Sequence, residues 1–130
     1  MPKKVLIVDD EVDAVEFVKE IAEDEGYTAI FAHDGPKGLE KMRQEKPDLV
    51  ILDVQMPGMD GFEVFAEMKK DENLKNIPVI MLTGIKDKVG LRFSGEAMRD
   101  YLGHEPDDYI EKPIDPVRLK DSMKKILSAS

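Results

Sequence analysis

The stretch that decides the fold is Leu49-Val50-Ile51-Leu52, an unbroken apolar run that ends directly at Asp53. A strand with one face in water alternates apolar and polar residues, whereas a continuous run suits a strand covered on both faces of a parallel sheet. Comparable short runs are spread along the whole chain, at Val5–Val8, Thr28–Ala32, Val79–Leu82 and Tyr109–Ile110. The sequence therefore predicts five strands.

Amphipathic stretches with helical periodicity separate these runs. The two longest apolar stripes are Ala14, Phe17, Val18 and Ile21 near the start and Leu119, Met123, Ile126 and Leu127 near the end. Gly26 can end the first of these stretches in a left-handed conformation. Aspartates suited to capping a helix N-terminus precede three later stretches, at Asp34, Asp60 and Asp115.

Strands that alternate with helices form βαβ units, and right-handed crossovers leave few topologies. We expect an α/β fold with a single doubly wound parallel sheet of five strands, in the order 2-1-3-4-5, flanked by five helices. Such folds bind ligands beyond the carboxyl ends of the strands, where the strand order reverses. Here that point lies between the first and third strands, next to Asp9, Asp10 and Asp53.

Composition narrows the classes of function. With 130 residues, 42% of them hydrophobic and 36% charged, the chain fits one soluble domain over residues 1–130. A net charge of −9 argues against a surface that neutralises nucleic-acid phosphates or sits on anionic lipid. The sequence has no cysteine for disulfides or thiolate chemistry, and its apolar runs are too short to cross a bilayer. We expect a cytoplasmic protein.

Acids follow the first strand, where a nucleotide-binding domain would have a glycine-rich turn. Asp9-Asp10-Glu11 would repel a bare phosphate, and together with Asp53 they would form an oxygen-only site that suits Mg²⁺. The ordinary alternative is that acids at the start of a helix serve only as capping and dipole partners. Thr83 ends the fourth strand and Lys112 follows the fifth. Taken alone, the first would mean little at a strand end, and the second would ordinarily be a solvated charge.

In combination these motifs resemble the receiver domain of two-component response regulators, over roughly residues 3–127. The resemblance is carried by four features in order: Asp9-Asp10 after the first strand, Asp53-Val54-Gln55-Met56-Pro57-Gly58-Met59-Asp60-Gly61 after the third, Thr83 after the fourth, and Asp107-Asp108-Tyr109-Ile110-Glu111-Lys112-Pro113 around the fifth. It implies a domain that accepts a phosphoryl group on Asp53 from a phosphohistidine of a sensor histidine kinase or a phosphotransfer protein. Such a domain is a signalling module that catalyses only its own phosphorylation and dephosphorylation.

The resemblance also assigns a metal site. Asp10, Asp53 and the backbone carbonyl of Gln55 match the ligands of Mg²⁺, and Asp9 matches the residue that holds a metal-bound water. The ion is physically necessary, because an anionic nucleophile must approach an anionic phosphoryl group. Lys112 matches the lysine that pairs with a phosphoryl oxygen and that precedes a cis peptide bond to proline.

Thr83 and Tyr109 match the family's switch pair. The resemblance implies that Thr83 moves to hydrogen-bond the phosphoryl group and leaves space into which Tyr109 rotates. In the family this reshapes the face of the fourth helix, fifth strand and fifth helix, where partners bind or the domain dimerises. The output partner of this chain is not identified by its sequence.

The segment between Thr83 and Lys112 departs from the family, being longer by roughly one to two helical turns' worth of residues. We expect an extended loop there, followed by a short fourth helix that begins after Ser94. Ile85 is expected to hinder the hydrolytic water and so to lengthen the life of an aspartyl phosphate. His33 and His104 lack the spacing of metal ligands and are expected at the surface.

Two other functions compete with this interpretation. A phosphatase-like enzyme with an aspartyl nucleophile generally has a second acid two residues on, where this chain has Gln55, and it needs a substrate cap domain. A degenerate interaction module would keep the fold without the chemistry. The residues present argue against it: Asp10, Asp53, Thr83 and Lys112. No DNA-binding output domain is expected within these 130 residues.

Overall fold

Five parallel strands form one sheet in the computed structural model, which describes residues 2–84 and 105–128. The strand order is β2-β1-β3-β4-β5, which confirms the predicted topology. The strands are β1 (Lys4–Val8), β2 (Thr28–Ala32), β3 (Leu49–Asp53), β4 (Val79–Thr83) and β5 (Asp108–Glu111). Every expected strand is therefore present, with its bounds within about one residue of the apolar run that predicts it.

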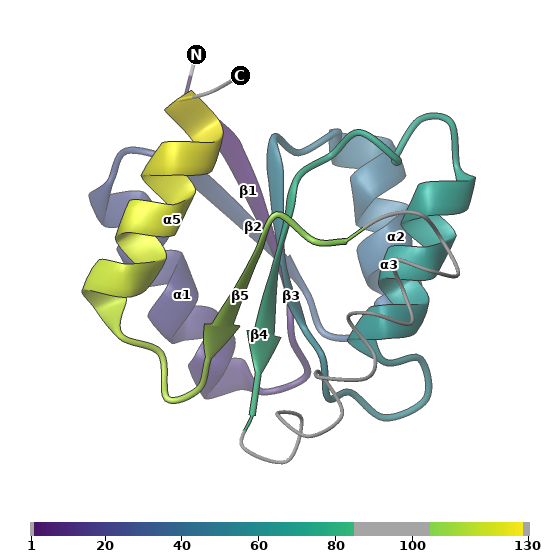
Figure 1. The fold of residues 1–130 in the computed structure, drawn as a ribbon, viewed down its shortest axis with the longest axis horizontal. Helices are drawn as coiled ribbons and strands as arrows, with labels where there is room; N and C mark the ends of the chain where they lie inside the picture. Colours follow the sequence, from purple (N-terminus) through teal and green to yellow (C-terminus); the bar gives the residue numbers. More distant parts are fainter. Residues whose placement is uncertain (1, 85–104, 129–130) are drawn as a thin grey trace.

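Helices cover both faces of this sheet (Figure 1). Within the described residues they are α1 (Val12–Asp24), α2 (Gly35–Glu45), α3 (Gly61–Lys70) and α5 (Pro116–Ser128). The first and last of these lie together on one face, and α2 and α3 lie on the other. The expected fourth helix after Ser94 falls outside the described residues, as do Ile85 and His104. None of the described helices is long and apolar enough to cross a membrane.

The sheet separates two apolar clusters. Successive residues of β1 point to opposite faces, so that Leu6 and Val8 pack under α2 and α3 while Val5 and Ile7 pack under α1 and α5. The run that predicts β3 is fully buried, with no exposed surface on any of its four apolar residues. The central strands are thus packed on both faces. This packing fixes the backbone positions from which the side chains after these strands extend.

The inward face of α1 differs from the prediction. The periodic stripe places Ala14 and Phe17 inward, but the buried residues are Val15, Val18 and Ala22, and Phe17 is 40% exposed. Apolar residues occur as adjacent pairs along this helix, so periodicity alone does not determine which of each pair lies at the centre of the buried face. In the structure the small Ala22 faces the sheet, one position on from the predicted stripe.

The predicted helix ends are confirmed. Asp34, Asp60 and Asp115 each accept a hydrogen bond from a backbone N–H in the first turn of the helix that follows. Glu63 completes a capping box with Asp60, which fixes where α3 begins. Gly26 has a φ of 86°, a left-handed conformation that suits glycine at the end of α1.

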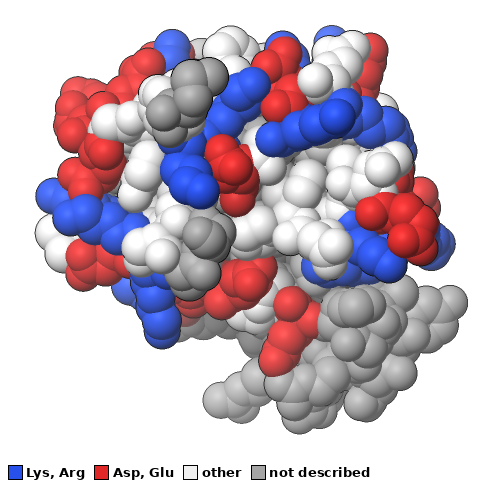
Figure 2. Space-filling view, turned by 90° about the horizontal axis from the view of Figure 1, so that it is seen from above, with Lys and Arg blue, Asp and Glu red and all other residues white. Residues whose placement is uncertain are grey.

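The end of the molecule where both chain termini lie carries mixed charge. Figure 2 shows lysine and arginine side chains interspersed with aspartate and glutamate side chains on this face. An example of such pairing is the salt bridge from Lys4, which begins β1, to Glu45, which ends α2, with Nζ and Oε1 3.0 Å apart. The strands run away from this end, so their carboxyl ends meet at the opposite edge.

Candidate functional site

The carboxyl ends of β1 and β3 bring two aspartates to the same edge of the sheet. In the parallel register Val8 lies beside Leu52, so the next residues, Asp9 and Asp53, both follow that pair. Asp9 is fully buried and Asp53 is 2% exposed. The predicted convergence of these two residues is therefore a direct consequence of the strand order.

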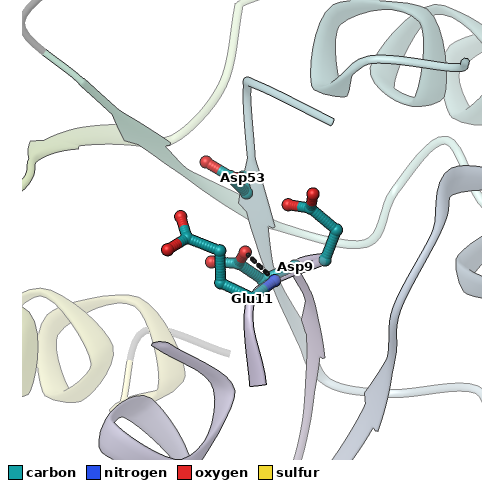
Figure 3. Close-up of side chains that lie close together, drawn as sticks. Asp9, Glu11 and Asp53 are labelled. Atoms are coloured by element: carbon teal, nitrogen blue, oxygen red, sulfur yellow. Dashed lines mark hydrogen bonds between the residues drawn. The ribbon is translucent and has the colours of Figure 1, made fainter. Parts of the chain in front are cut away.

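Asp10 and Glu11 complete a cluster of acids with these two residues. One carboxylate oxygen from each of the four lies within 4.8 Å of the others. The labelled side chains of Asp9, Glu11 and Asp53 lie close together beyond the strand ends (Figure 3). The backbone N–H of Glu11 donates to Oδ1 of Asp9 at 3.0 Å, which fixes the buried carboxylate at the start of α1.

Lys112 reaches this cluster from the loop after β5. Its Nζ lies 3.2 Å from Oδ2 of Asp9, 3.2 Å from Oδ1 of Asp53 and 3.5 Å from Oε1 of Glu11. Burial by itself would lower the pKa of Lys112, but the Asp53 and Asp9 carboxylates raise it above its ordinary value, so the amine stays charged. The peptide bond to Pro113 is cis, as the resemblance implies.

The surroundings of Asp53 disfavour the ionised form of its carboxylate. Burial, followed by the nearby Asp9 charge, raises its pKa to about 7, although Lys112 opposes this shift. Low solvent exposure and a like charge both disfavour the ionised form, and a single ammonium offsets them only in part. The site thus favours an additional positive charge.

The donor set can hold a metal ion. One carboxylate oxygen from each of four acids lies within 4.8 Å of the others, and oxygen-only sites with few protein ligands suit hard divalent cations such as Mg²⁺. Asp9 and Asp53 are buried while Asp10 and Glu11 are exposed, so the cluster is open on one side to water. This geometry fits an ion that keeps several water ligands.

The β3–α3 loop keeps Asp53 at the edge of the sheet. Val54 is buried, and its N–H donates to the carbonyl of Leu82 at 3.0 Å, so the β3 ladder continues one residue beyond Asp53. The carbonyl of Val54 accepts from the N–H of Gly61 at 2.9 Å, which closes the loop. Gln55, whose carbonyl is an expected ligand, is an exposed residue within this closed loop.

Thr83 and Tyr109 lie on the neighbouring strands. Thr83 ends β4 and is 1% exposed, and its carbonyl accepts from the N–H of Lys112 at 2.7 Å. Tyr109 lies in β5 beside Met81 and packs, partly buried, against the cluster under α2 and α3. Its Oη is buried without a hydrogen-bond partner in the described part of the chain. Burial, with a smaller contribution from Glu105, raises the pKa of Tyr109.

Comparison with known proteins identifies the family. A family model described as the response regulator receiver domain matches residues 5–124. This chain belongs to that family. The receiver domain resembles the alkaline phosphatase synthesis transcriptional regulatory protein PhoP of Bacillus subtilis, with 39% identity over 132 residues, 100% of this chain and 50% of that protein. It is 34% identical to the polar-differentiation response regulator DivK of Brucella anthropi over 98% of each chain.

A solved structure agrees with these relatives. The signal receiver domain of a signal transduction histidine kinase from Syntrophus aciditrophicus superposes with a TM-score of 0.85 at 34% identity, over 98% of this chain and 91% of that one. The chain spans about half the length of several of the curated relatives that it matches, PhoP among them. The receiver family is generally one of non-enzymatic signalling modules.

Sequence reasoning missed the part that Glu11 plays in this receiver domain. It places Glu11 among the acids of the cluster but does not predict its contact with Lys112, whose Nζ lies 3.5 Å from the Glu11 carboxylate. The available signal was the negative charge directly after Asp10. His33, by contrast, is exposed as predicted, and its Nδ1 lies 3.1 Å from the carbonyl oxygen of Asp9.

Proposed function

We propose that this receiver domain accepts a phosphoryl group on Asp53 from the phosphohistidine of a sensor histidine kinase or a phosphotransfer protein. The observation that carries the proposal is the position of the Asp53 carboxylate, which is 2% exposed, 3.2 Å from the Lys112 ammonium, and surrounded by further acids. Receiver domains as a family are phosphorylated by histidine kinases. A buried carboxylate with a fixed cation beside it and an open side for a donor fits that role.

The transfer forms a bond between a carboxylate oxygen of Asp53 and phosphorus. The bond between phosphorus and the histidine nitrogen breaks, and its electron pair leaves with the imidazole. Lys112 already contacts both Asp53 and Asp9, so its ammonium can turn from a carboxylate oxygen to a phosphoryl oxygen with a small movement. The product is an acyl phosphate, which water later hydrolyses.

Magnesium dependence follows from the charge of the cluster. Asp10, Asp53 and the Gln55 carbonyl would hold the ion, and Asp9 would hold one of its water ligands. The bound ion supplies positive charge that offsets the repulsion between an anionic nucleophile and an anionic phosphoryl group. Support comes from the four clustered acids and from the raised pKa of Asp53, which is consistent with a site where one ammonium offsets the negative charge only in part.

Signalling would follow through Thr83 and Tyr109. A new phosphoryl group brings about −1.5 to −2 charges and three strong acceptors, which the Thr83 hydroxyl at the adjacent strand end can bond. The Tyr109 hydroxyl is already buried without a partner in the described residues, so a neighbouring rearrangement can change its position at little cost in hydrogen bonds. The output partner or a second copy would then bind the face that includes β5 and α5 in the phosphorylated state.

Intact mass spectrometry tests the proposal. The protein is incubated with acetyl phosphate, with Mg²⁺ in one arm and excess EDTA in the other. We expect the wild type to gain one phosphoryl group in the Mg²⁺ arm alone, and Asp53→Asn to gain none. Incorporation into Asp53→Asn at the wild-type rate would contradict the assignment, and sustained release of p-nitrophenol from its phosphate ester would favour a phosphatase instead.

A further inference from the structure

The first residue of α3 packs directly against the backbone of Asp53. The N–H of Gly61 donates to the carbonyl of Val54 at 2.9 Å. A Cβ atom on Gly61 would overlap the carbonyl oxygen of Asp53 and would lie 2.8 Å from Cα of Val54 and 3.1 Å from the carbonyl carbon of Asp53. Every one of these neighbours is a backbone atom, which cannot give way by rotating a side chain.

Two other glycines show how different this contact is. A Cβ on Gly38 would lie 3.0 Å from the two methyl groups of Val8, and a Cβ on Gly35 would meet side-chain atoms of Val64 and Met59 at 2.9–3.0 Å. In both places the crowded atoms belong to side chains, which can shift by a few tenths of an ångström. Gly61 therefore differs from Gly35 and Gly38 in what it touches rather than in how buried it is.

The Asp53 backbone cannot absorb a displacement on its own. The next residue, Val54, donates its N–H to the carbonyl of Leu82 in β4 at 3.0 Å, and its carbonyl is held by Gly61. The partners of the Asp53 carboxylate lie elsewhere, since Lys112 follows β5 and Asp9 follows β1. A shift of the Asp53 peptide away from α3 would change the distances from its carboxylate to both partners.

We propose that Gly61 is a positioning residue for the phosphoacceptor, because its missing side chain lets α3 close against the Asp53 peptide and sets where that carboxylate lies. This inference rests on the proposed phosphorylation of Asp53. Gln55 lies in the loop that the Gly61 hydrogen bond closes. The same contact therefore also sets the position of the Gln55 carbonyl, which is expected to bind Mg²⁺. A displacement of about 1 Å at a reacting group lowers a rate by about 100-fold.

The test compares Gly61→Ala with Gly38→Ala, which is the same change at a similarly crowded glycine whose neighbours are side-chain methyl groups. The rate of phosphorylation by acetyl phosphate is measured by intact mass and divided by the folded fraction, determined by circular dichroism. Mg²⁺ affinity is measured by titration calorimetry. An arm with trimethylamine N-oxide, which favours compact states, keeps the variants folded if they are marginally stable.

We expect Gly61→Ala to lose at least about 10-fold in rate per folded molecule and to bind Mg²⁺ more weakly, while Gly38→Ala stays within about twofold of the wild type. Equal rates per folded molecule in the two variants and the wild type would overturn the inference, because Gly61 would then serve only the stability of the fold. A wild type that takes up no phosphoryl group would overturn the proposed function, and the positioning role with it. Phosphorylation of the wild type with an unaffected Gly61→Ala would overturn the positioning role alone.

Discussion

Two aspartates at opposite edges of the sheet have opposite electrostatic surroundings. Asp108, at the start of β5, accepts hydrogen bonds from both terminal nitrogens of Arg118 at 2.8 Å and from Oγ of Ser122 at 2.6 Å. The Arg118 hydrogen bond, despite partial burial, lowers the pKa of Asp108 below its ordinary value. Asp53, at the end of β3, has its pKa raised to about 7 by burial and by Asp9.

The difference separates a carboxylate that ties two elements of the fold together from the proposed phosphoacceptor. The oxygens of Asp108 are saturated by donors from α5, so this residue ties β5 to that helix and has little capacity for a further ligand. The oxygens of Asp53 share the Lys112 ammonium with two other acids. Binding of another cation or hydrogen-bond donor would therefore stabilise the site. Perturbed carboxylates of the second kind concentrate at functional sites.

The largest expected effect comes from removing the cation beside the proposed phosphoacceptor. Lys112→Met keeps the aliphatic stem but leaves the acids without their ammonium. We expect the rate of phosphorylation by acetyl phosphate to fall by about 100- to 1,000-fold, because a fixed charge at a developing phosphoryl group is lost. The matched control is Lys120→Met, whose ammonium lies 3.5 Å from Oε2 of Glu25. A loss of similar size in the control would show that the effect is not specific to the acidic cluster.

The two aspartates should respond to neutralisation with opposite signs. In EDTA at pH 8 we expect Asp53→Asn to raise the free energy of unfolding by about 1–2 kcal/mol, because it relieves a buried charge held beside another acid. We expect Asp108→Asn to lower it by about 1–2 kcal/mol, because an amide cannot accept both Arg118 bonds. Urea unfolding monitored by circular dichroism measures both values. Destabilisation by Asp53→Asn as large as that by Asp108→Asn would remove the contrast.

The stabilisation from Asp108 should depend on pH in a defined direction. Its pKa is lower in the folded than in the unfolded chain, so its contribution is present above the unfolded value of about 4 and disappears as the pH falls through the lower folded value. We expect the difference in unfolding free energy between wild type and Asp108→Asn to be constant from pH 7 to pH 5 and to shrink below about pH 4. Urea unfolding at each pH measures it, and a difference that grows in acid would contradict the sign of the shift.

Much of the fold could be predicted because it depends on local patterns. The apolar run at Leu49–Leu52 and the alternation of strands and helices are sufficient to give a parallel sheet, and the strand order then forces Asp9 and Asp53 together. The inward face of α1 could not be chosen in this way. Apolar residues at neighbouring positions allow two faces one residue apart, and only packing on the sheet selects Val15 over Ala14.

The fine structure of the site depends on distances that a sequence does not contain. The contact of Gly61 with the Asp53 backbone requires the depth at which α3 closes on β3. The pairing of Asp108 with Arg118 requires the rotation of α5 about its axis. These residues lie in recognisable motifs or helices, but the spacing of a motif specifies the order of residues along the chain and not the distances between their atoms.

The smallest expected effect concerns Glu11, one of the two exposed members of the acidic cluster. Its side chain is 68% exposed and its Oε1 lies 3.5 Å from Nζ of Lys112, so water screens the pair and the interaction is weak. We expect Glu11→Gln to change the phosphorylation rate by less than about fivefold.

The direction of this change is informative, because Glu11 competes with a phosphoryl oxygen for Lys112 while it also adds negative charge that attracts Mg²⁺. At saturating Mg²⁺ only the competition remains, so the rate should rise, and at limiting Mg²⁺ it should fall. Initial rates from intact mass at two Mg²⁺ concentrations measure this, and a fall of more than tenfold at saturating Mg²⁺ would place Glu11 with Asp53 as an essential acid.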